Sequence, residues 1–288
     1  MDIHDIRLGQ IGTMVTFSCS LKCKMCSTAT PLLHLKGKAL AYDRMVKSYD
    51  KFFELADFVG KFTLGGGEPL LLPELPQLVE HMIESHREKI GVLEIITNGT
   101  QMPSPELIET LKRYGDQIIV MVDHYGEHSP LASEVGAVLT DNGIPNRIRI
   151  YHGPDCHMNG WVDLGDYSLK HTTREEKAEL MKKCAHVGEK MGICVADGLL
   201  FACGRAYTSL QLGLVKKELP DFVDIFDPTK TVEQLRQEMI DLINIEYTSA
   251  CAYCNGLCLD SPRFMPAIQW SPEEIEDIKA GWPYINAG

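Results

Sequence analysis

The sequence of 288 residues lacks any apolar run of the length that spans a membrane, and its N-terminus lacks the apolar core of a secretory signal. Internal repeats and low-complexity segments are also absent. Positive charge is scarce, because 28 lysines and arginines stand against 40 aspartates and glutamates, giving a formal net charge of −12. That balance argues against nucleic-acid binding and against a basic membrane-binding patch. We therefore expect a cytoplasmic protein that binds neither nucleic acid nor membrane.

Ten cysteines are the unusual part of an otherwise ordinary composition. Hydrophobic residues make up 44% and charged residues 24% of the chain, as in soluble globular proteins. Structural disulfides seldom persist in a reducing cytosol, so this number of cysteines predicts metal binding.

Three cysteines follow the apolar run 14–17 with the spacing C-x3-C-x2-C: Cys19, Cys23 and Cys26. Iron–sulfur cubanes are usually held by four thiolates, so three thiolates leave one iron open to a substrate or cofactor. A zinc knuckle is the main alternative, but it needs a fourth ligand nearby, and the next seven residues contain no cysteine or histidine. A set of buried free thiols is the third interpretation.

The first half of the chain alternates β-branched runs with amphipathic helical patterns. Strand-like runs occur at 14–17, 62–64, 92–97, 118–122 and 148–151, with helical spacing between them. Such alternation predicts βαβ units and a parallel sheet, which a doubly wound sheet or a barrel would satisfy equally. The motifs favour a barrel, because each follows the carboxyl end of a strand, where barrel active sites lie.

Two further motifs follow the cysteines in order: GGGEPLL at 65–71 and ITNGT at 96–100. Together the three motifs resemble those of the radical S-adenosylmethionine (SAM) superfamily. The resemblance implies an α/β fold, with a partial six-unit (β/α) barrel over residues 1–170 and residues 162–164 as a possible sixth strand. It also implies a [4Fe–4S] cluster on the three cysteines whose open iron is chelated by SAM. One electron from that cluster would cleave SAM to methionine and a 5′-deoxyadenosyl radical.

The resemblance also assigns residues to SAM. Gly66, Gly67 and Glu68 would hold the methionyl amino group, with Glu68 as an acceptor, although a tight turn alone would also use these glycines. Asn98 occupies the TNG position, which suits an ordinary turn residue equally.

Two later strands complete this set. Asp123 ends the fourth strand in VMVDHYG, where related enzymes often carry Ser–x–Asp and this chain has Met121 at the serine position. Arg147 and Arg149 lie on the fifth strand. Of the two, we predict that the Arg149 guanidinium binds the SAM carboxylate bidentately. A surface ion pair is the alternative.

A second cysteine pattern occupies the last third of the chain. The spacing C-x13-G-x4-C over residues 184–203 resembles the opening of the twitch and SPASM extensions of radical SAM enzymes, and CAYCNGLC follows at 251–258. The resemblance implies a small twitch-like domain over residues 171–288, a β-hairpin plus helices, that carries an auxiliary [4Fe–4S] cluster. A zinc ribbon is the alternative, since two cysteine pairs also satisfy tetrahedral zinc. The predicted ligands are Cys184, Cys203, Cys251 and Cys254, with Cys258 as an alternative ligand.

The family chemistry predicts an oxidoreductase. The 5′-deoxyadenosyl radical abstracts a substrate hydrogen, the auxiliary cluster takes the second electron, and a reductase such as flavodoxin or ferredoxin is the expected partner. Loops 123–130 and 151–166 are rich in His, Asp and Asn, which suits a small hydroxylated metabolite. The chain also reaches its first predicted strand almost at once, leaving no room for an N-terminal peptide-recognition domain, and this favours the same substrate class.

Other functions stay open. Modification of a ribosomal peptide or protein would use the same cofactors. A non-enzymatic iron–sulfur electron-transfer protein would share the cysteines, but it would not need the GGEP and TNG motifs. Cys156 lies near a strand end and is a candidate hydrogen donor to a substrate radical, which would make the net reaction an epimerisation; a spectator thiol is the alternative.

Overall fold

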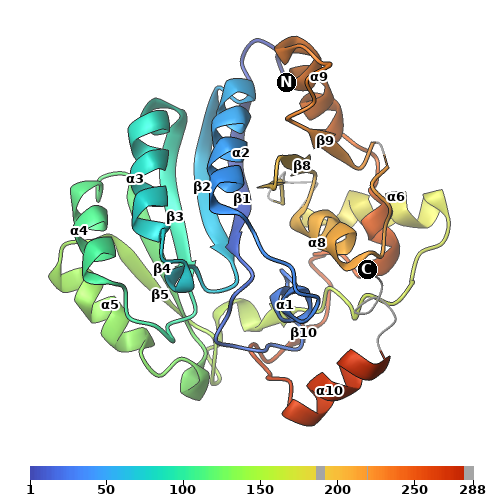
Figure 1. Ribbon diagram of the computed structural model, residues 1–288. Helices are drawn as coiled ribbons and strands as arrows, with labels where there is room; N and C mark the ends of the chain where they lie inside the picture. Colours follow the sequence, from blue (N-terminus) through green and yellow to red (C-terminus); the bar gives the residue numbers. More distant parts are fainter. Residues whose placement is uncertain (186–191, 219, 282–288) are drawn as a thin grey trace.

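The protein is described by a computed structural model that covers residues 1–185, 192–218 and 220–281. Its centre is an eight-stranded sheet with the strand order β5-β4-β3-β2-β1-β7-β8-β9 (Figure 1). Five neighbouring strands from the first 150 residues are parallel, which confirms the predicted α/β fold. They are β1 (Arg7–Thr16), β2 (Phe58–Gly66), β3 (Ile90–Thr97), β4 (Ile118–His124) and β5 (Asn146–Ile150).

Helices between these strands cover one face of the sheet, at the centre and on the left of Figure 1. They are α2 (Tyr42–Leu55), α3 (Leu75–His86), α4 (Pro105–Arg113) and α5 (Ala132–Asp141), with the short α1 (Thr30–Leu35) before α2. Local chemistry explains where they begin. Ser104 caps α4 by accepting the Leu107 N–H at 3.1 Å, and Pro105 takes the first helical position, where no N–H is needed.

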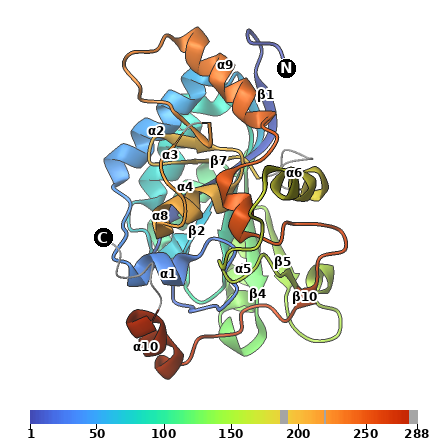
Figure 2. The ribbon, with the colours of Figure 1, turned by 90° about the vertical axis from the view of Figure 1, so that its right-hand side faces the viewer.

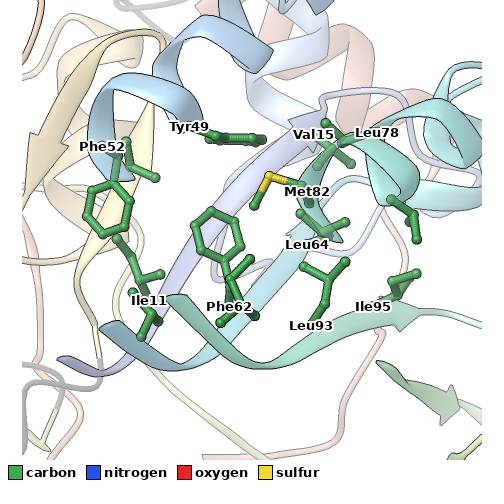
Figure 3. Close-up of a cluster of buried hydrophobic side chains, with 14 of the residues drawn as sticks. Ile11, Val15, Tyr49, Phe52, Phe62, Leu64, Leu78, Met82, Leu93 and Ile95 are labelled. Atoms are coloured by element: carbon green, nitrogen blue, oxygen red, sulfur yellow. The ribbon is translucent and has the colours of Figure 1, made fainter. Parts of the chain in front are cut away.

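The main hydrophobic core lies between this face of the sheet and helices α2 and α3 (Figure 3). Phe62 and Leu64 of β2 are fully buried in it, beside Tyr49 of α2. The residues that alternate with them along β2, Lys61 and Thr63, face the opposite side of the sheet and line a cavity there. The period-two alternation of a strand therefore separates the packed face from the face that holds the candidate site.

The prediction of a sixth barrel strand at 162–164 is wrong. Trp161–Val162 forms β6, but β6 pairs antiparallel with β10 (Arg263–Phe264) in a separate two-stranded sheet. Gly160 permits this pairing: its φ is +104°, and a Cβ atom there would lie 2.4 Å from the carbonyl oxygen of Phe264. The chain after β5 thus meets the C-terminal segment and not the edge of the large sheet.

The large sheet extends instead beyond β1. β7 (Cys194–Ala196) pairs parallel with β1 through Gly12 and Cys194, and β8 (Leu199–Phe201) and β9 (Phe222–Asp224) follow antiparallel. These strands include the β-hairpin predicted for the C-terminal region, which is formed by β7 and β8. Asp197 and Gly198 form its turn with φ values of +52° and +78°, the left-handed conformation that favours Asp-Gly in two-residue hairpins.

The rest of the C-terminal region consists of helices and irregular segments. α6 (Arg174–Lys183) and α9 (Val232–Ile243) each begin with a capping box. α8 (Gly204–Leu212) begins directly after Cys203, and α10 (Pro272–Gly281) ends the described chain. Single 3-10 turns occur at Pro69–Leu71, Arg87–Lys89, Gly126–His128, His157–Asn159 and Ser249–Tyr253.

The predicted domain boundary near residue 170 falls between β6 and α6, and it stays a prediction. The β7–β8 hairpin lies after this boundary, yet it is hydrogen-bonded into the same sheet as β1. Within the three described ranges, no helix has both the length and the apolar character needed to cross a membrane.

Candidate functional site

The carboxyl ends of the parallel strands open into a cavity of about 530 Å³, which we call the barrel cavity. This volume is typical of sites for small molecules. The cavity is lined by most of the predicted cluster and SAM residues, which come from five separate segments of the chain. These residues are Cys19, Cys23, Cys26, Gly66, Gly67, Asn98, Asp123 and Arg149.

Close backbone contacts hold the cysteine loop against the end of β2. The Gly67 N–H donates to the Thr16 carbonyl at 2.7 Å, and the Glu68 N–H donates to the Ser18 carbonyl at 2.8 Å. A Cβ atom at Gly67 would lie 2.1 Å from the Ser18 oxygen. Glycine is therefore required because the GGE segment packs directly against the residue that precedes Cys19.

The structure corrects the role predicted for the Glu68 side chain. Its carboxylate is fully buried and does not line the barrel cavity. Oε1 accepts the Leu70 N–H at 3.0 Å, and Oε2 accepts the Asn98 N–H at 2.7 Å. Burial raises the pKa of Glu68 to about 7, although these hydrogen bonds oppose the rise. The carboxylate joins the GGE segment to the TNG turn and is not free to receive an amine.

Asn98 reaches from the end of β3 back to the cysteine loop. Its Nδ2 lies 3.5 Å from the Cys19 Sγ and 3.3 Å from the Ser20 Oγ. Its Oδ1 accepts the Thr100 N–H at 3.0 Å, and the Ser20 and Thr100 hydroxyls lie 2.5 Å apart. The TNG turn therefore fixes the Cys19 side of the loop in addition to lining the cavity, and hydrogen bonds of this kind orient metal ligands.

The described thiols are farther apart than the sulfurs around a single zinc ion. Within the described part of the chain, no three cysteine sulfurs lie within 4.8 Å of one another. Tetrahedral zinc with Zn–S bonds of about 2.3 Å would bring its sulfurs to about 3.8 Å. Burial raises the pKa of the Cys19 thiol to about 11 and that of Cys23 to about 12, so metal binding must displace their protons.

One contact to this loop was not found from the sequence. Gln269 places its Nε2 3.3 Å from the Cys23 Sγ, and its Oε1 accepts the Lys22 N–H at 2.6 Å. Backbone hydrogen bonds of 2.8 Å join residues 268–270 to Lys22 and Lys24. In Figures 1 and 2 the C-terminal segment, drawn in red, lies at the same end of the molecule as α1. No local motif marks Gln269, because its partner lies at the other end of the chain.

Asp123 and Arg149 face the barrel cavity as an ion pair. The Arg149 Nε lies 2.5 Å from Asp123 Oδ1, and its terminal nitrogen lies 2.9 Å from Oδ2, a bidentate geometry. The Tyr125 hydroxyl donates to the same carboxylate at 3.1 Å. Burial raises the pKa of Asp123, and the charge of Arg149 opposes that rise. Arg147 is exposed, so Arg149 is the arginine of this strand that reaches the cavity.

Polar side chains continue along the cavity wall away from the strand ends. Gln10 of β1, Lys61 and Thr63 of β2 and Glu94 of β3 all line it. The Thr63 hydroxyl donates to Glu94 Oε1 at 2.9 Å, and the Lys61 Nζ lies 3.3 Å from the same oxygen. The Glu94 side chain is only 8% exposed. The sequence analysis missed this group, and its signal was a charged residue inside the β-branched run VLEIIT.

The C-terminal cysteines gather around a second, smaller cavity, which we call the auxiliary cavity. Its lining includes all four predicted ligands: Cys184, Cys203, Cys251 and Cys254. The Leu257 N–H donates to the Cys184 Sγ at 3.4 Å, and the Gly256 N–H donates to the Cys254 Sγ at 3.3 Å. Backbone donors to sulfur are among the features that tune iron–sulfur clusters, so this thiol set fits such a group.

The remaining cysteines lie outside this group of four. Cys258, the predicted alternative ligand, is buried but does not line the auxiliary cavity. Cys194 is buried on β7 and lines the barrel cavity. Cys156 lines neither cavity, and its Sγ lies 4.0 Å from the His157 carbonyl oxygen. The structure therefore does not support Cys156 as a hydrogen donor to a ligand in the barrel cavity.

Comparison with curated proteins points to the same family as the motifs. Residues 13–146 match the model of the Radical SAM superfamily. A GTP 3′,8-cyclase of Syntrophomonas wolfei is 29% identical over 116 residues, which are 40% of this chain and only 34% of that protein. A probable GTP 3′,8-cyclase of Methanococcus maripaludis is 21% identical over 281 residues, which cover 92% of this chain and 86% of that protein.

Solved structures share the fold over nearly the whole chain. The structure of anSMEcpe with bound AdoMet and Cp18Cys peptide has a TM-score of 0.50 at 14% identity and covers 97% of this chain and 98% of that one. BtrN in an open conformation has a TM-score of 0.51 at 14% identity and covers 88% and 96%. The match identifies residues 13–146 as a radical SAM domain, a domain whose family uses a [4Fe–4S] cluster and SAM as cofactors.

Proposed function

We propose that this protein is a radical SAM oxidoreductase that acts on a small hydroxylated substrate and uses an auxiliary [4Fe–4S] cluster on a twitch-like extension. The observation that carries the proposal is the presence of two separate thiol groups facing neighbouring cavities. The three thiols predicted to bind the first cluster line the barrel cavity, and the four predicted auxiliary ligands line the auxiliary cavity. Leu164 and Arg205 line both cavities, so the two groups share a wall.

The chain's own residues supply the sites for both cofactors. Cys19, Cys23 and Cys26 would bind the first cluster, and the four cysteines of the auxiliary cavity would bind the second. Because the Glu68 carboxylate is turned inward, we assign the SAM amino group to the backbone carbonyls around Gly66 and Gly67. When bound, SAM and the first cluster supply the 5′-deoxyadenosyl radical that abstracts a hydrogen atom, and the auxiliary cluster supplies the acceptor for the second electron. A flavodoxin or ferredoxin would provide one electron and take one back.

The polar wall of the barrel cavity supports a small hydroxylated substrate. Lys61, Thr63 and Gln10 offer hydrogen-bond donors, and Glu94 offers a largely buried acceptor. A hydroxyl or amine group could form hydrogen bonds with these side chains, whereas an apolar ligand would offer them none. Arg149 would place the SAM carboxylate, with Asp123 holding its guanidinium in position.

A purine nucleotide is the second candidate class of substrate. It is favoured by the relatives named GTP 3′,8-cyclase, one of which aligns with 92% of this chain. The formal charge of −12 weighs against it, because a triphosphate needs several cations. A peptide is the third class, since anSMEcpe was solved with a bound peptide.

Iron counting tests the two cluster sites. Anaerobically reconstituted protein should hold about eight irons per chain, because two cubanes are expected. Replacing Cys19, Cys23 and Cys26 by alanine should remove about half of the iron, and replacing the four cysteines of the auxiliary cavity should remove the other half. Cys156→Ser is the matched control and should lose none. One cluster's worth of iron together with one zinc would contradict the auxiliary assignment.

Turnover tests the reaction and the substrate class. The reduced protein should cleave SAM slowly to 5′-deoxyadenosine, and Cys23→Ala should abolish this. Sets of polyols and amino sugars, purine nucleotides and cysteine-containing peptides should then be compared for faster SAM cleavage. Acceleration by polyols or amino sugars, with an oxidised product, is expected. Acceleration confined to nucleotides or to peptides would replace the proposed substrate class, and unimpaired cleavage by Cys23→Ala would overturn the site.

A further inference from the structure

Arg205 occupies an unusual position between the two cavities. It is in the first turn of α8, two residues after Cys203, and only 5% of it is exposed. It lines the barrel cavity and the auxiliary cavity, as does Leu164. A permanent positive charge is therefore buried in the wall that separates the two thiol groups.

Neutral groups alone hold this guanidinium in place. One terminal nitrogen donates to the Gly165 carbonyl at 2.8 Å and to the Tyr253 carbonyl at 3.1 Å. The guanidinium carbon lies 3.5 Å from the centroid of the Tyr167 ring, a cation–π contact. The buried Nε has no hydrogen-bond partner, and in the described ranges Arg205 forms no ion pair. A buried charge without a counter-ion is costly. A negative group bound beside Arg205 would therefore be strongly favoured.

The thiols of the auxiliary cavity can provide that negative group. Tyr253, whose carbonyl accepts from Arg205, directly precedes Cys254. Arg205 lines the same cavity as Cys254 and the three other thiols of this group. Four thiolates around a cubane carry a net negative charge, which is largest in the reduced form. A fixed cation beside them would stabilise the reduced form most and raise the reduction potential.

We propose that Arg205 is the counter-ion of the auxiliary cluster and lies on the side of that cluster that faces the barrel cavity. As a positioning residue, it would raise the reduction potential of the cluster. The inference rests on the proposed function, because it requires the second cluster. It adds a reason why that cluster would accept an electron from the substrate side: the positive charge lies between the electron donor and the thiolates. Tyr167 and the two carbonyls keep the charge there before any ligand binds.

The test is a redox titration of the auxiliary cluster in the full chain, monitored by electron paramagnetic resonance. Changing Cys19, Cys23 and Cys26 to alanine leaves the auxiliary cluster as the only signal. In that background, Arg205→Met removes the charge and keeps the length, and Arg205→Lys keeps the charge. Arg174→Met is the matched control, since Arg174 is a 66% exposed arginine on α6 whose loss solvent would screen.

We expect a more negative midpoint potential for Arg205→Met, a midpoint near the parent value for Arg205→Lys, and no change for Arg174→Met. Loss of the cluster in Arg205→Met with retention in Arg205→Lys also supports the counter-ion role, because lysine keeps the positive charge and methionine does not. A full cluster with the parent midpoint in Arg205→Met overturns the inference. Loss of the cluster in both Arg205 variants overturns it as well, because the charge would then not suffice. Absence of a second cluster in the parent chain refutes the proposed function itself, and iron counting detects that separately.

Discussion

Replacing Gly67 by alanine tests the packing that holds the cysteine loop. The added Cβ would lie 2.1 Å from the Ser18 carbonyl oxygen and 2.8 Å from the Ser18 carbonyl carbon. Ordinary carbon–oxygen contacts need about 3.3 Å, so the two backbones must separate by about 1 Å. Both atoms belong to main chain that is hydrogen-bonded across the same gap, so no flexible side chain can absorb the change.

The expected consequences of Gly67→Ala are loss of the first cluster and a moderate loss of stability. Cys19 follows Ser18, and metal sites tolerate ligand displacements of only about 0.2 Å. Iron content should therefore fall by about half, with the auxiliary cluster kept. Overpacking of this kind costs about 2 kcal/mol, or about 4–8 °C in the melting temperature of a protein of this size.

Gly65→Ala is the matched control, because it makes the same substitution two residues earlier. Its Cβ would meet the Thr13 carbonyl oxygen at 3.7 Å, an ordinary contact. The assays are iron and sulfide content, visible absorption and thermal melting of both variants under anaerobic conditions. If Gly67→Ala binds as much iron as Gly65→Ala and melts at the same temperature, the close approach does not position the cysteine loop.

Three further predictions concern other parts of the chain. The pKa of Glu68 is raised by burial to about 7 from an ordinary 4.5, so its contribution to stability is present below pH 4.5 and is lost as the pH rises to about 7. Glu68→Gln should flatten this decline in the free energy of unfolding, measured by urea unfolding of the cluster-free protein. A free energy of unfolding that falls with pH as in the wild type would show that Glu68 does not titrate in this range. Arg236→Ala should lower the melting temperature by about 4–8 °C, because it removes bonds to Ile3 and Leu55 carbonyls and to Asp57 worth about 2 kcal/mol together; a melt equal to wild type would contradict this. Cys156→Ser should leave SAM cleavage and product stereochemistry unchanged, and loss of product with cleavage retained would restore the hydrogen-donor role.

The parallel sheet was predictable because each strand carries its own local signal. Buried residues such as Phe62 and Leu64 are close together in sequence, and the helices between strands show their own periodicity. The same reasoning placed Asn98 and Asp123 at strand ends and Arg149 on the fifth strand, and parallel strands bring such residues to one edge. What was predictable, therefore, depends on short-range pattern and on the geometry common to all parallel sheets.

The missed features all depend on contacts between distant segments. β6 pairs with Arg263–Phe264, and Gln269 contacts the loop of Cys23, yet neither C-terminal segment has a periodic or motif-like pattern. Glu68 failed for a different reason. Its motif lies at the end of β2 beside the cysteine loop, but the direction of the carboxylate is decided by two backbone donors, at Leu70 and Asn98, whose positions the sequence does not give.

The wall between the cavities shows most clearly what spacing leaves undecided. Spacing named Cys184, Cys203, Cys251 and Cys254 as a set, and the structure gathers them around one cavity. Spacing did not place that cavity against the barrel. The placement follows from β7, which joins β1 through Gly12 and carries the hairpin and α8 with it. Because α8 begins directly after Cys203, the same pairing also sets Arg205 between the thiol groups. One strand pairing therefore determines whether the auxiliary thiols are near enough to the barrel cavity to take part in its chemistry.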